Sequence, residues 1–298
     1  MRFLVAVALV LNLSCARTGV VTLVEDAGSQ PVFGGSRPVK VSVPKRYAGR
    51  ATPLLLALHG YGNAGKPFES YLGLPSLVDS QGIFLVSPDG TLDAQGHRFW
   101  NTGSDACCNF AGSAVDDVKY LRELLAEIRG IYNVDPRRIF VLGHSNGGFM
   151  AYRLACELSG EIAAIMSLAG ATPDCHPTAP VSVLQIHGDR DVGVRYDGGT
   201  NILKKGGGDY FGALESAERW ALDDGCTPYA PAPPRTEGQP IDLESELPGG
   251  ETMVEDFDGC PAGVGVSLWT IREGSHNPEL SEAFASQVWA WLESHQRR

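Results

Sequence analysis

The sequence predicts an α/β protein in which a mostly parallel sheet is covered by helices on both faces. Short apolar segments of strand length alternate with longer segments along most of the chain. The longer segments carry apolar residues at helical spacing. Such alternation is typical of parallel sheets, because each parallel connection must cross over the sheet. The 298 residues, 43% of them hydrophobic, are enough for one large core.

The predicted elements follow a regular order after an irregular start. Two antiparallel edge strands, 20–24 and 39–43, are expected around the turn at Gly34 and Gly35. The alternating series then comprises strands 54–58, 83–87, 139–142, 163–168, 183–186 and 266–271 and helices 115–129, 146–158, 210–222 and 281–293.

Two details of this series depend on single residues. Ser113 with Asp116 matches a capping box for the helix that begins at 115, and Gly130 is expected to end that helix. The segment 227–248 lacks periodicity and is rich in proline, so it is predicted to be a surface loop or lid.

The beginning of the chain has the pattern of a signal peptide. Arg2 precedes a short apolar run, and small residues follow it near Ala16. The run is shorter than the roughly 20 residues of a membrane-spanning helix, so no transmembrane segment is expected. We therefore expect residues 1–16 to be removed on export and residues 20–298 to form a single domain. Cys15 leaves a second interpretation open, which is lipid attachment at this residue.

Charge and cysteine content narrow the function classes. The net charge of −11, without a large basic cluster, argues against a nucleic-acid partner. An even number of cysteines after Cys15, behind an export signal, predicts disulfide bonds. Cys226 is expected to pair with Cys260. The adjacent cysteines are expected to bond to the other two, in an order that stays open: Cys107, Cys108, Cys156 and Cys175. No metal site is expected, because no Cys-X-X-Cys or suitable histidine pair occurs.

A nucleophile motif occurs where strand 139–142 meets helix 146–158. The residues Gly143-His144-Ser145-Asn146-Gly147 match Gly-X-Ser-X-Gly between a strand and a helix, which is the context of a nucleophile elbow. The motif alone is weak in a glycine-rich chain, and the flanking elements give it weight. On such a turn the serine hydroxyl projects from the sheet at the positive end of the helix. Ser145 is therefore the predicted nucleophile.

A serine nucleophile requires a histidine base and a carboxylate that orients the base. In sheet hydrolases with this elbow, both follow on loops after later strands. Asp191 follows strand 183–186 and is the predicted acid. Asp189 is the alternative, although it follows a glycine directly and is expected to serve the turn. His276 follows strand 266–271 and is the predicted base.

Two further roles are expected beside these residues. The backbone N–H groups of Asn146 and Tyr61 are predicted to form an oxyanion hole, because the second lies in a glycine-rich loop after strand 54–58. Trp100 lies near the sheet edge where ligands bind and is predicted to contact substrate by stacking. A core or lid position for this tryptophan is the alternative.

These residues resemble those of secreted α/β-hydrolase esterases, the polyhydroxybutyrate depolymerase and feruloyl or acetylxylan esterase group. The resemblance implies an α/β-hydrolase fold, an acyl-enzyme, no cofactor, and a triad of Ser145, Asp191 and His276. One segment departs from the pattern, because Ser275 precedes the histidine and no Trp-Pro follows it. The matching segments are Leu58-His59-Gly60-Tyr61-Gly62, Cys107-Cys108, Val115-Asp116-Asp117-Val118, residues 134–139, residues 143–148, residues 153–157, residues 187–191 and Gly274-Ser275-His276.

The resulting expectation is an exported, monomeric serine esterase with a single catalytic domain. Its expected substrates are polyhydroxyalkanoate oligomers or feruloyl and acetyl esters of plant polysaccharides. A serine peptidase of the same fold is one alternative. A surface-binding lipoprotein that has lost activity is the other, because a fold alone does not establish a function.

Overall fold

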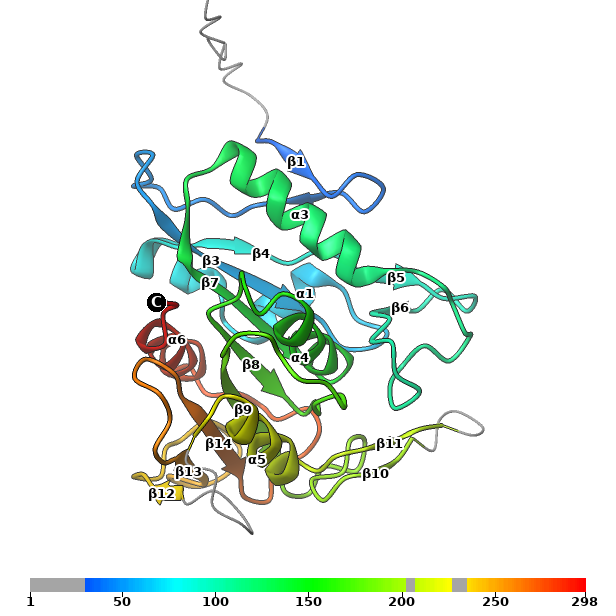
Figure 1. Cartoon of the computed structure of the whole chain (residues 1–298), viewed down its shortest axis with the longest axis vertical. Helices are drawn as coiled ribbons and strands as arrows, with labels where there is room; N and C mark the ends of the chain where they lie inside the picture. The colour runs from blue at the N-terminus through cyan, green and yellow to red at the C-terminus, as the bar shows by residue number, and fades with distance from the viewer. Residues whose placement is uncertain (1–29, 202–206, 227–234) are drawn as a thin grey trace, which may run out of the picture. The chain divides into compact units, whose positions relative to one another are not determined.

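An eight-stranded sheet forms the centre of the structure (Figure 1). The computed structural model describes residues 30–201, 207–226 and 235–298, of which Pro31–Arg298 belong to one compact unit. The expected signal peptide, Cys15 and the expected strand 20–24 lie outside the described residues.

Most of this sheet is parallel, as the alternation of strands and helices predicts. The order across the sheet is β12-β13-β14-β9-β8-β7-β3-β4, and all strands from β14 to β4 pair in parallel. The parallel strands are β3 (Thr52–Leu58), β4 (Phe84–Val86), β7 (Val134–His144), β8 (Ala164–Leu168), β9 (Ser182–Gly188) and β14 (Val266–Ile271). Strands β3 and β9 are buried at every position, as expected for strands covered on both faces.

Helices cover both faces of the sheet. On the face toward the viewer in Figure 1 lie α3 (Asp117–Ile131), α4 (Asn146–Glu157) and α5 (Ala213–Asp223). On the other face lie α1 (Gly65–Tyr71), α2 (Pro75–Leu77), which continues into a π-helical turn (Val78–Gly82), and α6 (Phe284–Ser294). Alternate residues of β3 point into different cores, because Leu54 and Leu56 pack with α3 and α4 whereas Leu55 packs with α1 and α6. None of the helices in the described residues is long and apolar enough to span a membrane.

The far edge of the sheet differs from the prediction. Strands β12 (Arg235–Glu237) and β13 (Thr252–Phe257) extend it in antiparallel fashion, so the predicted loop 227–248 is wrong for β12. Residues 227–234 lie outside the described residues. Charged and exposed side chains on β12 hide the strand in the sequence, and such side chains are common on edge strands.

Within the described residues, three two-stranded ribbons lie outside the main sheet. The predicted strand 39–43 is only partly formed, as β2, which pairs with β1. Ser42 then forms an isolated antiparallel bridge with Leu85 of β4. The ribbons are β1 (Val32–Phe33) with β2 (Val39–Lys40), β5 (Thr91–Leu92) with β6 (Arg98–Phe99), and β10 (Gly199–Thr200) with β11 (Asp209–Tyr210).

The ends of α3 correct two single-residue predictions. The N-cap is Asp116, whose carboxylate accepts a hydrogen bond from the backbone N–H of Lys119 at 2.9 Å. Ser113 is therefore not the cap. The helix also runs past Gly130 to Ile131, since a single glycine costs a helix only about 1 kcal/mol.

The disulfide bonds agree with one expectation and contradict another. Cys226 is joined to Cys260, as the sequence predicts. Cys107 and Cys108 are bonded to each other, so the prediction that they join Cys156 and Cys175 is wrong. Cysteine counts limit the possible pairings without supplying the distances that decide among them.

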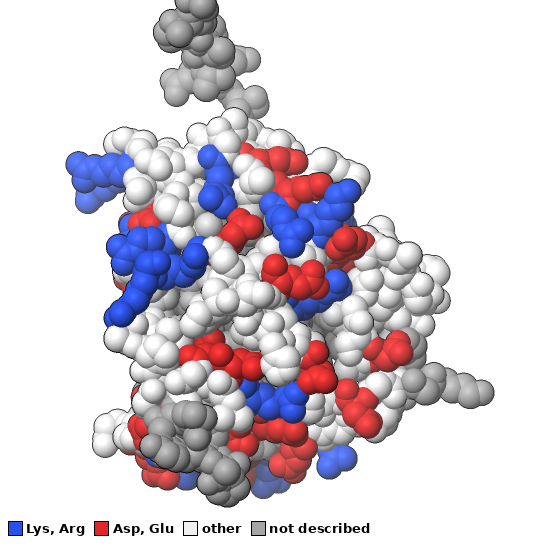
Figure 2. Space-filling view, viewed as in Figure 1, with Lys and Arg blue, Asp and Glu red and all other residues white. Residues whose placement is uncertain are grey.

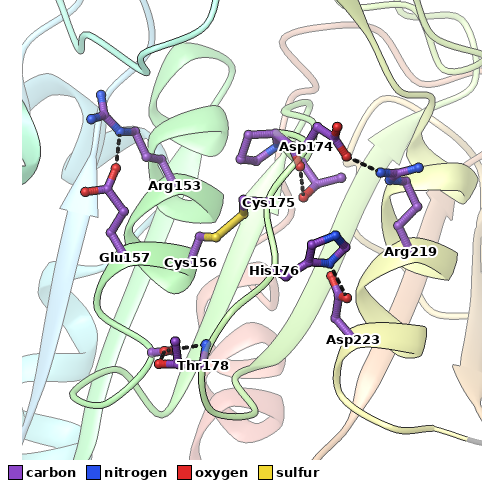
Figure 3. The surroundings of a disulfide bond; sticks show 12 residues. Arg153, Cys156, Glu157, Asp174, Cys175, His176, Thr178, Arg219 and Asp223 are labelled. Carbon is purple, nitrogen blue, oxygen red and sulfur yellow. Dashed lines mark hydrogen bonds and ion pairs between the residues drawn. A yellow bond between two sulfur atoms is a disulfide. The ribbon is translucent and has the colours of Figure 1, made fainter.

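The remaining bond, Cys156 to Cys175, connects α4 to the segment that follows β8 (Figure 3). The same segment is tied to α5 by an ion pair of Asp174 with Arg219 and by a hydrogen bond between His176 and Asp223. The helix after the predicted nucleophile is therefore bonded covalently to a segment that is itself held against α5.

Acidic and basic side chains are interspersed on the face shown in Figure 2. Several basic side chains of the described residues take part in ion pairs, such as Arg129 with Glu161 and Arg138 with Asp135. These pairs are partly exposed, so each contributes little to stability.

Candidate active site

The predicted nucleophile, acid and base lie at the same edge of the sheet. Ser145 directly follows β7, Asp191 lies in the loop after β9, and His276 lies in the loop after β14. These strands run parallel within one continuous part of the sheet. Their carboxyl ends therefore meet, and this is where ligands bind in open α/β sheets.

The three side chains form a continuous line of hydrogen bonds. His276 Nε2 lies 3.0 Å from Ser145 Oγ, and His276 Nδ1 lies 2.7 Å from Asp191 Oδ2. The imidazole side chain is 20% exposed and the side chain of Asp191 is fully buried. In this arrangement His276 Nδ1–H donates to the carboxylate, and Nε2 is free to accept the serine proton.

Ser145 lies on a tight bend between β7 and α4. Its backbone has φ 53° and ψ −119°, in the positive-φ region that non-glycine residues seldom adopt. The bend needs glycine close by, because a Cβ on Gly147 would lie 1.9 Å from the carbonyl oxygen of Leu58. A Cβ on Gly143 would lie 2.1 Å from the carbonyl oxygen of Gly147. The Gly-X-Ser-X-Gly spacing therefore follows from backbone contact.

The carboxylate of Asp191 is held on both oxygens. Oδ1 accepts the backbone N–H groups of Gly193 at 2.7 Å and Val194 at 2.8 Å. Burial acts to raise the pKa of Asp191, but hydrogen bonds from His187 and His276 outweigh it and hold the pKa well below its usual range. The carboxylate is therefore ionised at neutral pH. Asp189, the alternative acid, instead accepts the backbone N–H of Glu273 at 2.7 Å.

His144 supports the loop that carries His276. Its Nε2 lies 2.8 Å from the carbonyl oxygen of His276, so this nitrogen must carry the hydrogen. Burial and the neighbouring His276 lower the pKa of His144 to about 4. His144 is therefore neutral at pH 7 and fixes the backbone of the loop.

The residues predicted for the oxyanion hole lie beside Ser145. Asn146 is the first residue of α4, so its backbone N–H has no intrahelical acceptor. Tyr61 follows Gly60, on which a Cβ would lie 3.5 Å from the Ser145 Cβ. Tyr61 and Ser145 also line the same pocket. Both backbone segments therefore lie beside Ser145.

Trp100 does not occupy the position predicted for it. Its side chain is fully buried and is not part of the pocket wall, so the substrate-stacking prediction is wrong. Its backbone N–H and carbonyl group form two hydrogen bonds with the side-chain amide of Asn146, at 2.7 and 2.9 Å. The indole N–H donates to the carbonyl oxygen of His59 at 3.0 Å. Trp100 therefore connects the loop of Tyr61 to the start of α4 from inside the protein.

A pocket of about 540 Å³ opens beside Ser145 and His276. Aromatic and aliphatic side chains and the bonded pair Cys107 and Cys108 form most of its wall, and Arg195, Thr200 and Asn201 add polar groups. Val192, at the pocket, is 88% exposed. Apolar walls with a few polar groups are typical of small-molecule sites.

Known proteins with similar sequences and folds are esterases. Feruloyl esterase B of Piromyces equi is 31% identical over 249 residues, which is 80% of this chain and 42% of that protein. A probable feruloyl esterase C of Aspergillus niger is 26% identical over 251 residues, covering 81% of this chain and 76% of that protein. Among solved structures, an acetyl xylan esterase from Aspergillus awamori superposes with a TM-score of 0.60 at 14% identity, covering 90% of this chain and all of that chain. No protein-family model matches the sequence.

The chain has an α/β-hydrolase fold, and its sequence is similar to those of feruloyl esterases. The chain spans less than half the length of the first curated relatives, since the match covers 42% of feruloyl esterase B and 42% of a putative esterase of Nocardia uniformis. The structural likeness supports the fold alone, because the sequence identity to that structure is only 14%.

The sequence did not reveal the pocket walls of this α/β-hydrolase. The aromatic residues come from loops, from the first turn of α4 and from one short ribbon: Tyr61, Phe110, Phe149 and Tyr210. Their spacing in the sequence shows no pattern, so only the folded chain brings them together. The adjacent cysteines were a visible signal, but their position at the pocket was not.

Proposed function

We propose that this chain hydrolyses carboxylic esters through an acyl-enzyme on Ser145. The observation that carries the proposal is the hydrogen-bonded line from Ser145 through His276 to Asp191 at the wall of the pocket. Sequence similarity to feruloyl esterases supports the same reaction class. Ser145 is the nucleophile, His276 the general base and then acid, and Asp191 the group that orients and stabilises the imidazole.

Acylation begins when Ser145 Oγ attacks the ester carbonyl carbon and His276 Nε2 takes the hydroxyl proton. The carbonyl oxygen becomes negatively charged, and the backbone N–H groups of Tyr61 and Asn146 stabilise it. The bond from the carbonyl carbon to the alcohol oxygen then breaks. His276 Nε2 returns its proton to that oxygen, so the alcohol leaves in neutral form.

Deacylation repeats these steps with water. His276 Nε2 takes a proton from the water molecule as its oxygen attacks the acyl carbon. The bond to Ser145 Oγ breaks, and the proton on His276 returns to the serine. The carboxylic acid leaves, and Asp191 stays ionised throughout because its oxygens accept four hydrogen bonds.

The pocket favours an ester with a compact, partly apolar acyl or alcohol group. Its volume of about 540 Å³ lies within the range of ligand sites. We propose feruloyl or acetyl esters of plant polysaccharides, or polyhydroxyalkanoate oligomers, as the substrate class. The three disulfide bonds among the described residues favour an oxidising location, so we also propose that the protein is exported. We further propose that it acts as a monomer.

The nucleophile is tested by Ser145→Ala. The variant should lower kcat on p-nitrophenyl acetate and methyl ferulate by about 10³-fold or more, with an unchanged melting temperature, because the oxyanion hole alone leaves only residual catalysis. A fluorophosphonate probe should label the wild-type protein once and the variant not at all. Turnover near the wild-type rate in Ser145→Ala would place the nucleophile elsewhere.

The reaction class is tested with matched ester and amide substrates. The wild-type protein should release p-nitrophenol from short acyl esters much faster than p-nitroaniline from aminoacyl anilides. The reverse preference would indicate a peptidase. A folded wild-type protein that neither turns over esters nor accepts the probe would indicate a binding protein.

A further inference from the structure

A second histidine, His187, contacts the carboxylate of Asp191. It is the next-to-last residue of β9, and its side chain is 1% exposed. His187 Nε2 lies 3.2 Å from Asp191 Oδ2 and 2.8 Å from the carbonyl oxygen of Val194. Asp191 Oδ2 is also the oxygen that accepts from His276 Nδ1. Two imidazole rings therefore meet at one oxygen atom.

The neighbours of His187 determine which nitrogen carries the hydrogen. Both groups near Nε2 are acceptors, so Nε2 must be protonated. Nδ1 lies 3.1 Å from the side-chain nitrogen of Gln185. That amide also donates to the carbonyl oxygen of Gly170 at 2.9 Å, while its oxygen accepts from the hydroxyl of Tyr152 at 3.0 Å. The amide nitrogen is a donor, so Nδ1 must accept and the ring is neutral.

We propose that His187 is a positioning residue for the reaction. A buried line of hydrogen bonds runs from Tyr152 through Gln185 and His187 to Asp191, and it holds the carboxylate oxygen that faces His276. This inference rests on the proposed function, because it concerns the acid of the same triad. His187 does not line the pocket and has no hydrogen bond to Ser145, so it acts through Asp191.

The hydrogen bond has an electrostatic consequence as well as a steric one. Each donor to Asp191 Oδ2 stabilises the ionised carboxylate and weakens it as a base. Without the donor from His187, the carboxylate attracts the protonated form of His276 more strongly. The unprotonated imidazole that accepts the proton of Ser145 then forms only at higher pH. The acid side of the pH profile must therefore move upward when His187 is lost.

Other titratable groups face this site from several elements. His144, at the end of β7, lies 5.0 Å from His276 between ring centroids. The ring of Tyr196 lies 5.8 Å from His187, and its hydroxyl is hydrogen-bonded to Thr270. Arg195 lines the pocket. All of these remain in a His187 variant, so they act equally on both proteins.

The same chain contains another ion pair near the loops of the triad. Arg190 is paired with Glu273, and both side chains are more than half exposed. Solvent screens this pair, and it too is unchanged in a His187 variant.

The experiment compares the pH dependence of kcat/KM for His187→Leu, His187→Gln and the wild-type protein on p-nitrophenyl acetate. In His187→Leu the activity should fall about tenfold or more, as for other residues that orient a functional ligand. The midpoint on the acid side of its pH profile should rise by about half a pH unit. The reason is that Asp191, without the hydrogen bond from His187, attracts the protonated imidazole of His276 more strongly. His187→Gln keeps an N–H donor near the Nε2 position and should restore the wild-type midpoint.

Two controls separate the possible outcomes. Leu184→Ala removes a buried side chain from the same strand, toward the α6 core, so it should lower the melting temperature and leave the midpoint unchanged. Ser145→Ala in the same assay tests the proposed function, since activity that persists in it contradicts that function whatever His187 does. An inactive Ser145→Ala together with an unshifted His187→Leu would overturn the positioning role alone.

A second measurement uses the wild-type protein, in case His187→Leu does not fold. Nitrogen-15 NMR of labelled histidine, with His187→Gln to assign the signal, should show the hydrogen of this ring on Nε2 at neutral pH. A ring that carries its hydrogen on Nδ1 would contradict the proposal.

Discussion

Gly193 lies directly against the imidazole of His276. A Cβ at this position would lie 2.9 Å from the ring carbon Cγ and 3.2 Å from Nδ1. Gly193→Ala should therefore displace the ring and lengthen its hydrogen bonds to Ser145 and Asp191. A misplacement of a catalytic group by 1 Å can lower the rate about 100-fold, so we expect a loss of this size in kcat/KM. The melting temperature should change little. Steady-state kinetics and thermal unfolding measure both results.

Gly160→Ala is the matched control for this substitution. A Cβ at Gly160 would have no neighbouring atom within 4 Å, so activity and melting temperature should stay at their wild-type values. Equal activity in the two alanine variants would show that the ring of His276 can move aside without loss.

At the residue scale, the sequence predicted which three side chains meet at the sheet edge, but not the contacts of the residues around them. Ser145, Asp191 and His276 could be found because each follows an apolar strand, and parallel strands end at the same edge. Trp100 could not be placed, because its position along the chain does not show which way the side chain points. His187 precedes a glycine at a strand end, and only its folded neighbours show that it contacts Asp191.

At the element scale, the disulfide bond between Cys156 and Cys175 supports α4. It closes a loop with a sequence separation of 19, which corresponds to about 3 kcal/mol in the chain-entropy model. The double variant Cys156→Ala/Cys175→Ala should therefore lower the free energy of unfolding by about this amount, as urea denaturation would measure. Esterase activity in dilute buffer should remain, because core contacts of Met150 and Leu154 still hold α4 against the sheet.

The corresponding control uses a reductant. Under reducing conditions the wild-type protein and the double variant should differ much less in unfolding free energy than they do without reductant. If the two proteins have the same stability even under oxidising conditions, the bond contributes nothing to α4.

Elements with a strong apolar period were predictable, and those without it were not. Helix α4 and strand β9 fall close to their expected positions, because apolar residues recur along α4 with helical length and β9 is a short apolar run that is buried at every position. Strand β12 and helix α1 were missed. The first exposes charged residues at an edge, and the second is a short helix with a glycine at its start.

At the scale of the whole molecule, the parallel sheet follows from the chain order, but its outer edge does not. Alternating strands and helices predict a parallel sheet with right-handed connections, and the helices then must cover both faces. The return of the chain through β12 and β13 is a tertiary pairing. This pairing forms because β14 leaves one edge of the sheet open, and no local pattern in the sequence shows that edge.

The global stability should also depend on pH through Asp224. This residue caps the end of α5 and is 2% exposed. Its Oδ1 accepts the backbone N–H of Val181 at 3.0 Å, and its Oδ2 has no hydrogen-bond partner among the described residues. Burial raises the pKa of Asp224 to about 8, and the nearby Asp223 adds to the effect. The unfolded chain ionises this carboxyl near its reference pKa of about 3.9.

The sign of the effect follows from these two pKa values. Between about pH 4 and 8 the folded protein holds a proton that the unfolded chain releases, so the contribution of Asp224 to stability decreases as pH rises through this range. Asp224→Asn cannot ionise and should match the wild-type protein at pH 4. At pH 8 it should melt a few degrees higher than the wild-type protein, as expected for a change of about 1 kcal/mol or more.

Glu237→Gln, at an exposed position on β12, is the control and should show no such pH-dependent difference. Melting curves of the three proteins across this range test the argument, and a constant difference between Asp224→Asn and the wild-type protein at all pH values would contradict it.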